Sequence, residues 1–329
     1  MAQANISVVI CVYTERRWRE ILAAVESIRG QSVKSTEIIL VVDHNPALRD
    51  RLVTALPDVR ILENKEAQGL SGGRNTGISA ARGEVIAFLD DDAVADPDWL
   101  KYFSDCYADP AVLAVGGRTL PNWETMRPKW FPEEFDWTVG CTYLGMPRTR
   151  AVVRNIMGGN ASYRREVFDL AGGFRTSIGR AAGKRPLGCE ETELCIRIRK
   201  FRPEAVLLFE NQAVIHHLIP AIRCRPSYFT SRCYAEGLSK ALVAASVGAQ
   251  DGLSTERSYS TRTLPRGVVR GLGQAMHGDL WGAARGAAIV IGLAAAVAGY
   301  AVGSIPSRVN REVRAGRPNP NKKLSRDLP

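Results

Sequence analysis

Short apolar runs and amphipathic segments alternate along the first ninety residues of the chain. The runs are rich in β-branched residues and have the length of buried strands, at Ile6–Val12, 37–43, Arg60–Glu63 and 84–89. Between these runs the apolar residues recur with helical spacing, which predicts helices at Trp18–Arg29, 47–56 and 72–81. Repeated units of strand and helix predict an α/β fold with a Rossmann-like, mostly parallel sheet flanked by helices.

The alternation stops near residue 120. Residues 121–147 are rich in tryptophan, proline and charge, and we expect them to form loops over a site rather than part of a core. The periodic pattern then returns and predicts helices at 164–170 and 190–200, with a strand at 206–209.

The last third of the chain predicts a helical region of a different kind. Residues 286–306 contain no charge and are long enough to span a bilayer. They are mostly Ala and Gly, however, and the basic residues that follow would keep both ends on one side of a membrane. We therefore expect a re-entrant or interfacial helix, with a soluble helix packed on the N-terminal domain as the alternative.

These patterns divide the chain into three parts. Residues 1–245 form the domain that carries the chemistry, 246–306 a helical, membrane-associated region, and 307–329 a basic, disordered tail. The tail holds seven basic residues against two acidic ones, and it supplies half of the net charge of +10. Its Arg308, Arg311 and Arg314 would contact anionic headgroups.

Charge and cysteine usage narrow the class of protein. A basic chain attracts anions, but no basic motif with interleaved aromatic residues supports nucleic acid, so we expect no nucleic-acid partner. The seven cysteines are odd in number and form no C-x-x-C pair, which is typical of reduced, mostly buried thiols. No secretory signal precedes the first apolar run, so we expect the protein on the cytoplasmic side of the membrane.

The strand at 84–89 runs directly into Asp90, Asp91 and Asp92. Ligands of open α/β sheets bind beyond the carboxyl ends of such strands. Three carboxylates repel one another there unless a cation lies among them, and Mg²⁺ binds one or two carboxylates together with substrate phosphates. The pattern predicts a site for a metal and a diphosphate, with a solvated acidic turn or helix N-cap as the alternative.

Other polar residues follow neighbouring strands and should reach the same edge. Tyr13 and Glu15 come after the first strand, and Asp43 ends the second. The segment 69–75 is rich in glycine, opens a helix and places Arg74 near its N-terminus, where anions are favoured. A nucleotide would suit this edge, although the glycines alone could serve only a tight turn.

In family order, these motifs resemble glycosyltransferase family 2 over residues 6–245. The resemblance continues beyond Asp90-Asp91-Asp92 through Met157-Gly158-Gly159-Asn160 and Gly172-Gly173-Phe174 to Glu190-Glu191 and His216-His217. Members of this family are inverting enzymes with a GT-A fold that use nucleotide-sugar donors. The resemblance therefore implies an enzyme with Mg²⁺ or Mn²⁺ as cofactor.

The resemblance also implies roles for individual residues. Donor binding would fall to Tyr13, Glu15, Asp43, Arg74, Asn75, Asp90 and Asp91. The metal would be held by Asp92 with Asp90 and His216, and the pocket for the donor sugar and acceptor would be shaped by Gly158, Gly159 and Asn160.

Glu190 and Glu191 match the acidic pair in which the second acid is usually the general base. Inversion requires one carboxylate to take the proton of the acceptor hydroxyl while that oxygen attacks the anomeric carbon. We expect Glu191 to be this base, with Glu190 as the alternative. Both could instead be acids favoured by the dipole at a helix N-terminus.

The sequence thus predicts a metal-dependent, inverting glycosyltransferase of cell-surface glycan synthesis. UDP-sugars are the favoured donors, and the acceptor would be a glycan or lipid-linked saccharide. The chain is similar to members that transfer glucuronosyl or glucosyl units to polyprenyl-phosphate-linked sugars. The alternatives are a sugar-phosphate nucleotidyltransferase and a catalytically silent basic module that binds membranes.

Overall fold

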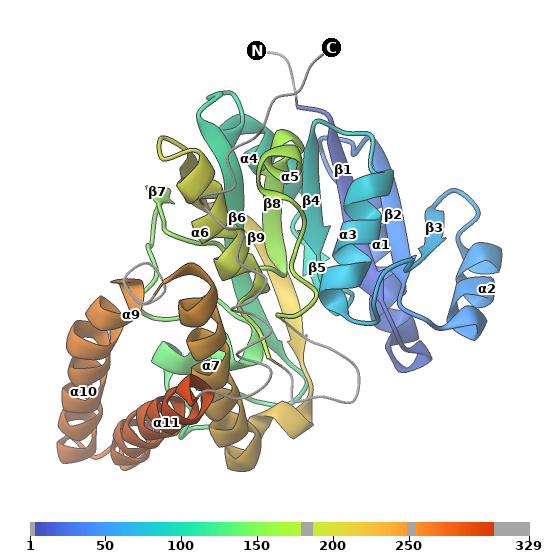
Figure 1. Cartoon of the computed structure of the whole chain (residues 1–329). Helices are drawn as coiled ribbons and strands as arrows, with labels where there is room; N and C mark the ends of the chain where they lie inside the picture. The colour runs from blue at the N-terminus through green and yellow to red at the C-terminus, as the bar shows by residue number, and fades with distance from the viewer. Residues whose placement is uncertain (1–3, 179–186, 249–253, 306–329) are drawn as a thin grey trace.

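The chain folds around one mixed, mostly parallel sheet (Figure 1). The structure is a computed structural model, and it describes residues 4–178, 187–248 and 254–305. Within those ranges the strand order is β3-β2-β1-β4-β8-β6-β9-β5, and β7 pairs with β9. The strands are β1 (Ile6–Val12), β2 (Glu37–Val42), β3 (Arg60–Glu63), β4 (Val85–Leu89), β5 (Ala93–Ala95), β6 (Val112–Trp123), β7 (Ala151–Val152), β8 (Asn160–Arg164) and β9 (Val206–Ile219).

The parallel half of the sheet contains β3, β2, β1 and β4, and helices cover both of its faces. On β1, Val8 and Ile10 point into one core cluster, whereas Val9 points into the other, because side chains alternate along a strand. The first cluster includes residues of α1 (Trp18–Arg29), α2 (Pro46–Ala55) and α4 (Trp99–Cys106). The second includes residues of α3 (Leu70–Ala80), α5 (Glu166–Ala171) and α6 (Glu190–Phe201). The predicted strands and helices of this half are confirmed to within two residues.

The other half of the sheet is mixed. β8 lies between β4 and β6 and is antiparallel to both, and β6 runs parallel to β9. β9 is far longer than the predicted strand at 206–209 and carries His216 and His217 within it. This extension brings the two histidines to the short strand β5, which directly follows the three aspartates.

The tryptophan-rich segment 121–147 does more than form loops. Its first residues extend β6, and Glu133–Val139 form the 3-10 helix η2. Phe131 and Phe135 are fully buried in a third core cluster with Phe229 and Ile289. The prediction that this segment contributes no core is therefore wrong, because its aromatic rings pack under the C-terminal helices.

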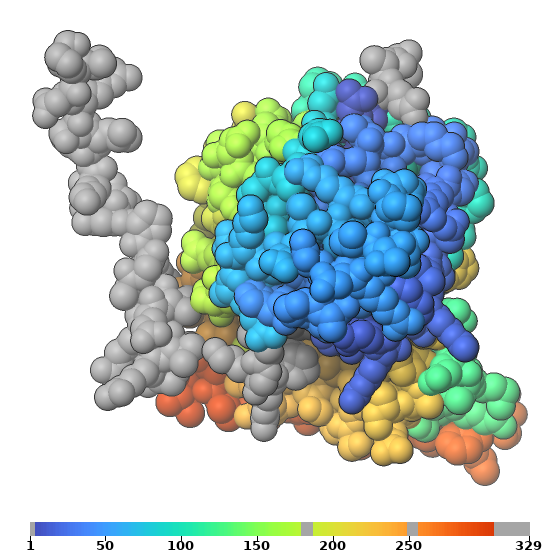
Figure 2. All heavy atoms as spheres, turned by 90° about the vertical axis from the view of Figure 1, so that its right-hand side faces the viewer, coloured from blue at the N-terminus to red at the C-terminus, as the bar shows by residue number. Residues whose placement is uncertain are grey.

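The C-terminal helices lie together beneath the sheet, and Figure 2 shows them as a layer under the N-terminal elements. They are η3 (Ala221–Cys224), α7 (Pro226–Val247), α9 (Ser254–Ser258), the π-helical turn η4 (Tyr259–Thr263), α10 (Leu264–Met276) and α11 (Trp281–Ser304). By length and composition α11 could cross a membrane, and it is the one such helix in the described ranges.

Glycines let α11 pack closely against α7. A Cβ on Gly237 of α7 would lie 2.0 Å from the carbonyl oxygen of Ala296, and one on Gly299 of α11 would lie 2.0 Å from that of Tyr234. Val290 and Val297 lie on the exposed side of α11. One side of this apolar helix is thus packed against α7, and another side is exposed to solvent.

The seven cysteines are all free thiols, as predicted, and none forms a disulfide. Five are buried, whereas Cys11 and Cys224 are half-buried.

Candidate active site

The three aspartates follow β4 at the edge where the parallel strands end. Asp91 and Asp92 are buried, and the side chain of Asp90 is one-third exposed. Asp90, Asp92 and His217 each offer a ligand atom, and these atoms lie within 4.8 Å of one another. Carboxylate oxygens suit Mg²⁺ and Mn²⁺, and an imidazole nitrogen is accepted better by Mn²⁺. The residues present therefore fit a divalent cation.

His216 lies on the other side of β9, because neighbouring residues of a strand point to opposite faces. Its Nε2 is 3.0 Å from Asp96 Oδ1, and the ring is half-exposed. His217 instead has Nδ1 3.3 Å from Asp92 Oδ1. The structure therefore brings His217, rather than the predicted ligand His216, next to the aspartates.

Arginines surround the acidic cluster. The guanidinium of Arg17 contacts Asp91 and places Nη2 2.9 Å from Asp92 Oδ2. Arg223 places Nη2 3.7 Å from the same Asp92 oxygen and donates from Nη1 to His217 Nε2 at 3.0 Å. Burial raises the pKa of Asp91 to about 7, although the nearby Arg17 opposes this shift. Arg17 is not among the site residues predicted from the sequence, where its position shortly after β1 is the available signal.

The two glutamates at the start of α6 have different surroundings. Glu190 is buried and accepts a hydrogen bond at 2.9 Å from Arg74, which also donates to the carbonyl of Gly158 at 3.0 Å. Glu191 lines the neighbouring cavity. Burial and the adjacent charge of Glu190 raise the pKa of Glu191 to about 8, with Arg74 opposing the shift. Glu190 is thus an ion-pair partner of Arg74, whereas Glu191 lines the cavity with a raised pKa.

A cavity of about 480 Å³ joins these groups to the C-terminal helices. Part of its lining is polar and consists of Arg74, Asp90, Glu190 and Glu191 together with Gly158 and Gly159. Another part is apolar or aromatic and comes from η2, η4, α10 and α11, with Phe135, Trp137, Tyr259, Leu264, Leu293, Val297 and Tyr300. The same cavity therefore offers both polar and apolar surface.

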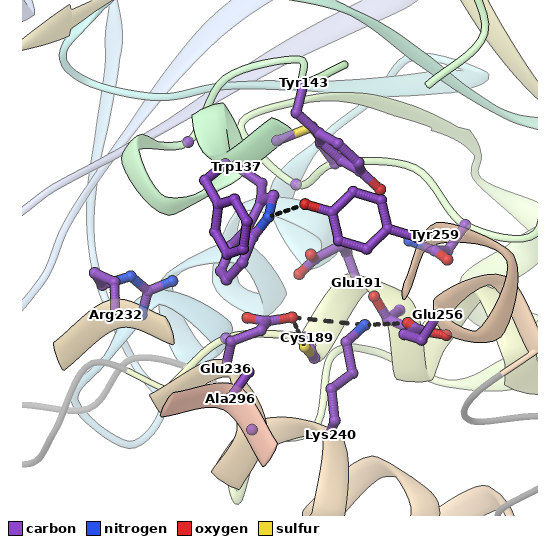
Figure 3. A pocket seen from close by; sticks show the side chains of 18 of the residues that line it. Trp137, Tyr143, Cys189, Glu191, Arg232, Glu236, Lys240, Glu256, Tyr259 and Ala296 are labelled. Atoms are coloured by element: carbon purple, nitrogen blue, oxygen red, sulfur yellow. Dashed lines mark hydrogen bonds and ion pairs between the residues drawn. The ribbon is translucent and has the colours of Figure 1, made fainter. Parts of the chain in front are cut away.

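A row of charged side chains crosses the cavity wall (Figure 3). Lys240 lies 3.5 Å from Glu236 and 2.7 Å from Glu256, and Glu256 also pairs with Arg154 at 2.8 Å. Cys189 donates to Glu236 at 3.2 Å. Across from this row, Trp137 donates from Nε1 to the hydroxyl of Tyr259 at 3.1 Å. These contacts tie α7 and α9 together beside the cavity.

The residues after β1 and β2 lie at the same edge. Tyr13 is 54% exposed, and the guanidinium carbon of Arg17 lies over the tyrosine ring, 5.3 Å from the ring centroid. Glu15 begins the 3-10 helix η1 (Glu15–Arg17) and is exposed. Asp43 accepts hydrogen bonds from the backbone of Gly69 at 3.0 Å and from Asn64 at 2.7 Å. Asp43 therefore holds the glycine-rich loop in place.

Two of the predicted site residues point away from the cavity. Asn75 exchanges two hydrogen bonds with the backbone of Phe174, at 2.8 and 2.9 Å. Asn160 is fully buried, accepts from Trp99 at 2.7 Å and donates to the carbonyl of Arg118 at 3.0 Å. Their amide groups are used inside the protein, which argues against direct contact with substrate.

Gly158 and Gly159 do line the cavity. A Cβ at position 159 would lie 2.3 Å from Asp90 Oδ2, and one at position 158 would lie 2.9 Å from Arg74 Nη2. Both positions therefore need glycine so that the side chains of Asp90 and Arg74 keep their places.

Comparison with known proteins identifies a family and a fold. The profile of Glycosyl transferase family 2 matches residues 7–171. A glucosyl-dolichyl phosphate glucuronosyltransferase of Haloferax volcanii is 36% identical over 240 residues, which are 72% of this chain and 76% of that protein.

Solved structures show the same fold. The mannosyltransferase PcManGT from Pyrobaculum calidifontis, in complex with GDP-Man and Mn²⁺, has a TM-score of 0.54 at 16% identity over 89% of this chain and 87% of its own. GalNAc-T7 with UDP, GalNAc and Mn²⁺ has a TM-score of 0.50 at 16% identity over 74% of this chain and 50% of its own. These likenesses confirm the predicted GT-A architecture.

Proposed function

This chain belongs to glycosyltransferase family 2, and we propose that it transfers a sugar, with inversion, from a nucleotide-sugar donor to a hydroxyl of a lipid-linked saccharide. UDP-sugars are the favoured donors, and the product would enter cell-surface glycan synthesis. The acceptor assignment rests on one observation. A single cavity is lined both by Asp90 and Glu191 and by apolar residues of α10 and α11.

On the donor side, Asp90, Asp92 and His217 would hold a divalent cation. When bound, this ion would stabilise the negative charge that develops on the departing diphosphate. The nucleotide would lie along the edge formed by Tyr13, Glu15 and Asp43, beyond the carboxyl ends of β1 and β2. Both solved structures named above contain a nucleotide and Mn²⁺, which supports this arrangement.

On the acceptor side, Glu191 would remove the proton of the attacking hydroxyl. Its raised pKa makes it a stronger base than an ordinary carboxylate, and it lines the cavity where an acceptor would lie. Glu190 would serve another purpose, because its charge is needed to neutralise the buried Arg74. This pair in turn would keep the Gly158–Gly159 backbone against Asp90.

The mixed lining of the cavity supports an amphiphilic acceptor. A saccharide would lie beside Asp90 and Glu191, whose carboxylates can accept hydrogen bonds from its hydroxyls, and a lipid chain would lie along the apolar residues of α11. The Haloferax relative is named for a glucosyl-dolichyl phosphate acceptor and glucuronosyl transfer. UDP-glucuronate and a polyprenyl-phosphate-linked glucose are therefore the first pair to test.

The exposed apolar residues support attachment to a membrane surface. Val269, Leu272 and Met276 of α10 are exposed, as are Leu280 and Trp281 at the turn into α11. Because α11 packs against α7, and α7 lines the cavity with charged residues, a full crossing by α11 alone would pull this interface apart. An interfacial placement on the cytoplasmic side, where nucleotide sugars are made, avoids that cost. The tail residues Arg308, Arg311 and Arg314 lie outside the described residues.

A panel of nucleotide sugars tests the proposal. The full chain is mixed with Mn²⁺ and with UDP-, GDP- or dTDP-sugars, and thermal stabilisation identifies the donor. Transfer to a short-chain lipid-linked glucose is then followed by mass spectrometry. Release of pyrophosphate from a nucleoside triphosphate and a sugar phosphate would instead identify a nucleotidyltransferase. No stabilisation by any nucleotide would contradict both enzymatic functions.

A further inference from the structure

Arg17 occupies the centre of the acidic cluster. Its guanidinium bridges Asp91 and Asp92, with Nη2 at 2.9 Å from Asp92 Oδ2. Asp92 is also one of the three residues that could ligate a metal. A cation of the protein and a metal ion would therefore use the same carboxylate.

Arginines offset most of the negative charge around the cluster. Among the described residues, Asp90, Asp91 and Asp92 lie within 4.0 Å of the guanidinium groups of Arg17, Arg74 and Arg223, and Arg74 also pairs with Glu190 at 2.9 Å. Four carboxylates thus face three guanidinium groups, with His217 and Cys11 beside them. A divalent ion added to this cluster would produce a net excess of positive charge. Repulsion between like charges at such distances is strong where water is excluded. A diphosphate that arrives together with the metal would remove the excess.

We propose that Arg17 is an internal counter-cation that competes with the metal for Asp92 and couples metal binding to binding of the donor diphosphate. This inference rests on the function proposed above. When metal and donor bind together, the guanidinium leaves the carboxylates and pairs with a phosphate oxygen. Without the nucleotide, Arg17 keeps metal affinity low.

Arg17 is better placed for this exchange than the other two arginines. Its side chain is 20% exposed, whereas those of Arg74 and Arg223 are 4% and 11% exposed. Arg74 is held by Glu190, and Arg223 is held by His217. Arg17 lies in the short helix η1, beside the exposed ring of Tyr13, so its own charge would reach water if the side chain turned outward, and the cost of the movement would fall on the buried Asp91.

The test compares Arg17→Gln with Arg16→Gln in the full chain. Arg16 is the exposed neighbour of Arg17, so the two variants have the same net charge and differ in contact with the cluster. Binding of Mn²⁺ alone is measured by electron paramagnetic resonance. Binding of UDP or GDP is measured by calorimetry with and without Mn²⁺.

Arg17→Gln is expected to bind Mn²⁺ alone about fivefold more tightly or better, and to bind the nucleotide without metal about fivefold more weakly. Nucleotide should therefore raise the Mn²⁺ affinity of Arg17→Gln by a smaller factor than it raises that of the wild type. Arg16→Gln should match the wild type in all three measurements. If Arg17 had only a structural role, its replacement would weaken the binding of both Mn²⁺ and nucleotide. The proposal instead expects the two affinities to change in opposite directions.

Equal Mn²⁺ affinity in the two variants would overturn the role of Arg17 while leaving the transferase proposal intact, provided that nucleotide still binds. Loss of both affinities in Arg17→Gln would also overturn it. If the wild type binds neither nucleotide, the proposed function itself fails.

Discussion

Glu190 and Glu191 are neighbours in sequence, yet their side chains have different surroundings. Glu190 forms an ion pair with the buried Arg74, and Glu191 lines the cavity and has a raised pKa. The sequence could identify the acidic pair but not divide the roles, because the division depends on which helix face meets Arg74. The same limit explains Asn75, Asn160 and His216, whose residue types suit a site although their side chains point elsewhere.

Replacement of the two glutamates should separate catalysis from stability. Glu191→Gln is expected to lower the rate of the chemical step by about 10²- to 10⁴-fold, the usual contribution of a positioned general base, with little change in donor affinity. Glu190→Gln removes the closest counter-charge of the buried guanidinium of Arg74, which otherwise has Asp90 at 4.0 Å, and should lower the free energy of unfolding by about 3–5 kcal/mol. Single-turnover kinetics and urea unfolding measure the two effects. Full turnover of Glu191→Gln, with a stable but inactive Glu190→Gln, would reverse the roles.

The raised pKa of Glu191 predicts a pH dependence for both activity and stability. A general base must be ionised, so kcat/KM should fall as the pH drops through about 8. The folded state holds the proton of Glu191 more tightly than the unfolded state does, between the ordinary pKa of 4.5 and the raised value of about 8. The free energy of unfolding should therefore decrease as the pH rises through this interval, and Glu191→Gln should remove that part of the decrease. A variant with the same pH dependence as the wild type would contradict the shift.

Activity should require a divalent cation, and Asp92→Asn should nearly abolish it. The substitution removes a charged ligand but keeps the shape of the side chain, so the melting temperature should stay close to that of the wild type. Turnover is measured with Mg²⁺ or Mn²⁺ and again in excess EDTA. Full turnover in EDTA would rule out the metal requirement.

At the scale of helices and strands, the sequence predicts best what depends on local pattern. The strands β1 to β4 and the helices between them follow from periodicity, because each strand is a short apolar run covered by its neighbouring helices. The antiparallel insertion of β8 and the full length of β9 depend on pairing between distant segments, which a local pattern does not encode. The packing of α11 on α7 likewise depends on glycines that meet only in the folded chain.

Glycine-to-alanine substitutions test this helix contact. An alanine at Gly299 places its Cβ 2.0 Å from the carbonyl oxygen of Tyr234, so α11 must shift away from α7 and the melting temperature should fall. Gly273 of α10 has no atom within 4 Å of the corresponding position among the described residues. Gly273→Ala should therefore be neutral or stabilise by about 0.5–1 kcal/mol through helix propensity. Similar melting temperatures for the two variants would argue against close packing of α7 and α11.

For the whole molecule, the chemistry and the exposed apolar residues lie on connected parts of the structure. The cavity begins at the end of the parallel strands and reaches the layer of helices beneath the sheet. Under the proposed function, the lipid-linked acceptor would approach from a membrane surface while the nucleotide sugar binds at the ends of the parallel strands. The sequence alone indicated both features but not their connection, because the cavity is built from segments far apart in the chain.

A charge placed on α10 should weaken attachment to vesicles. Leu272 is 53% exposed on α10, and Val53 is 49% exposed on α2, at the other end of the molecule. Leu272→Glu should reduce the fraction that floats with vesicles of phosphatidylglycerol and phosphatidylcholine, whereas Val53→Glu should leave it unchanged. Both sites are open to solvent, so stability should change by no more than about 0.5 kcal/mol. A wild-type chain that stays in the soluble fraction at low salt would contradict membrane attachment.

Burial protects six of the seven thiols, which leaves the remaining one, Cys224, as an attachment point for a spectroscopic probe. Maleimides react with thiolates, and burial raises the pKa of the six thiols Cys11, Cys106, Cys141, Cys189, Cys195 and Cys233. Cys224 is half-buried and directly follows Arg223, which contacts both His217 and Asp92. A fluorophore added near neutral pH should therefore attach mainly to Cys224. Its emission would report on events at the acidic cluster in an otherwise unaltered chain.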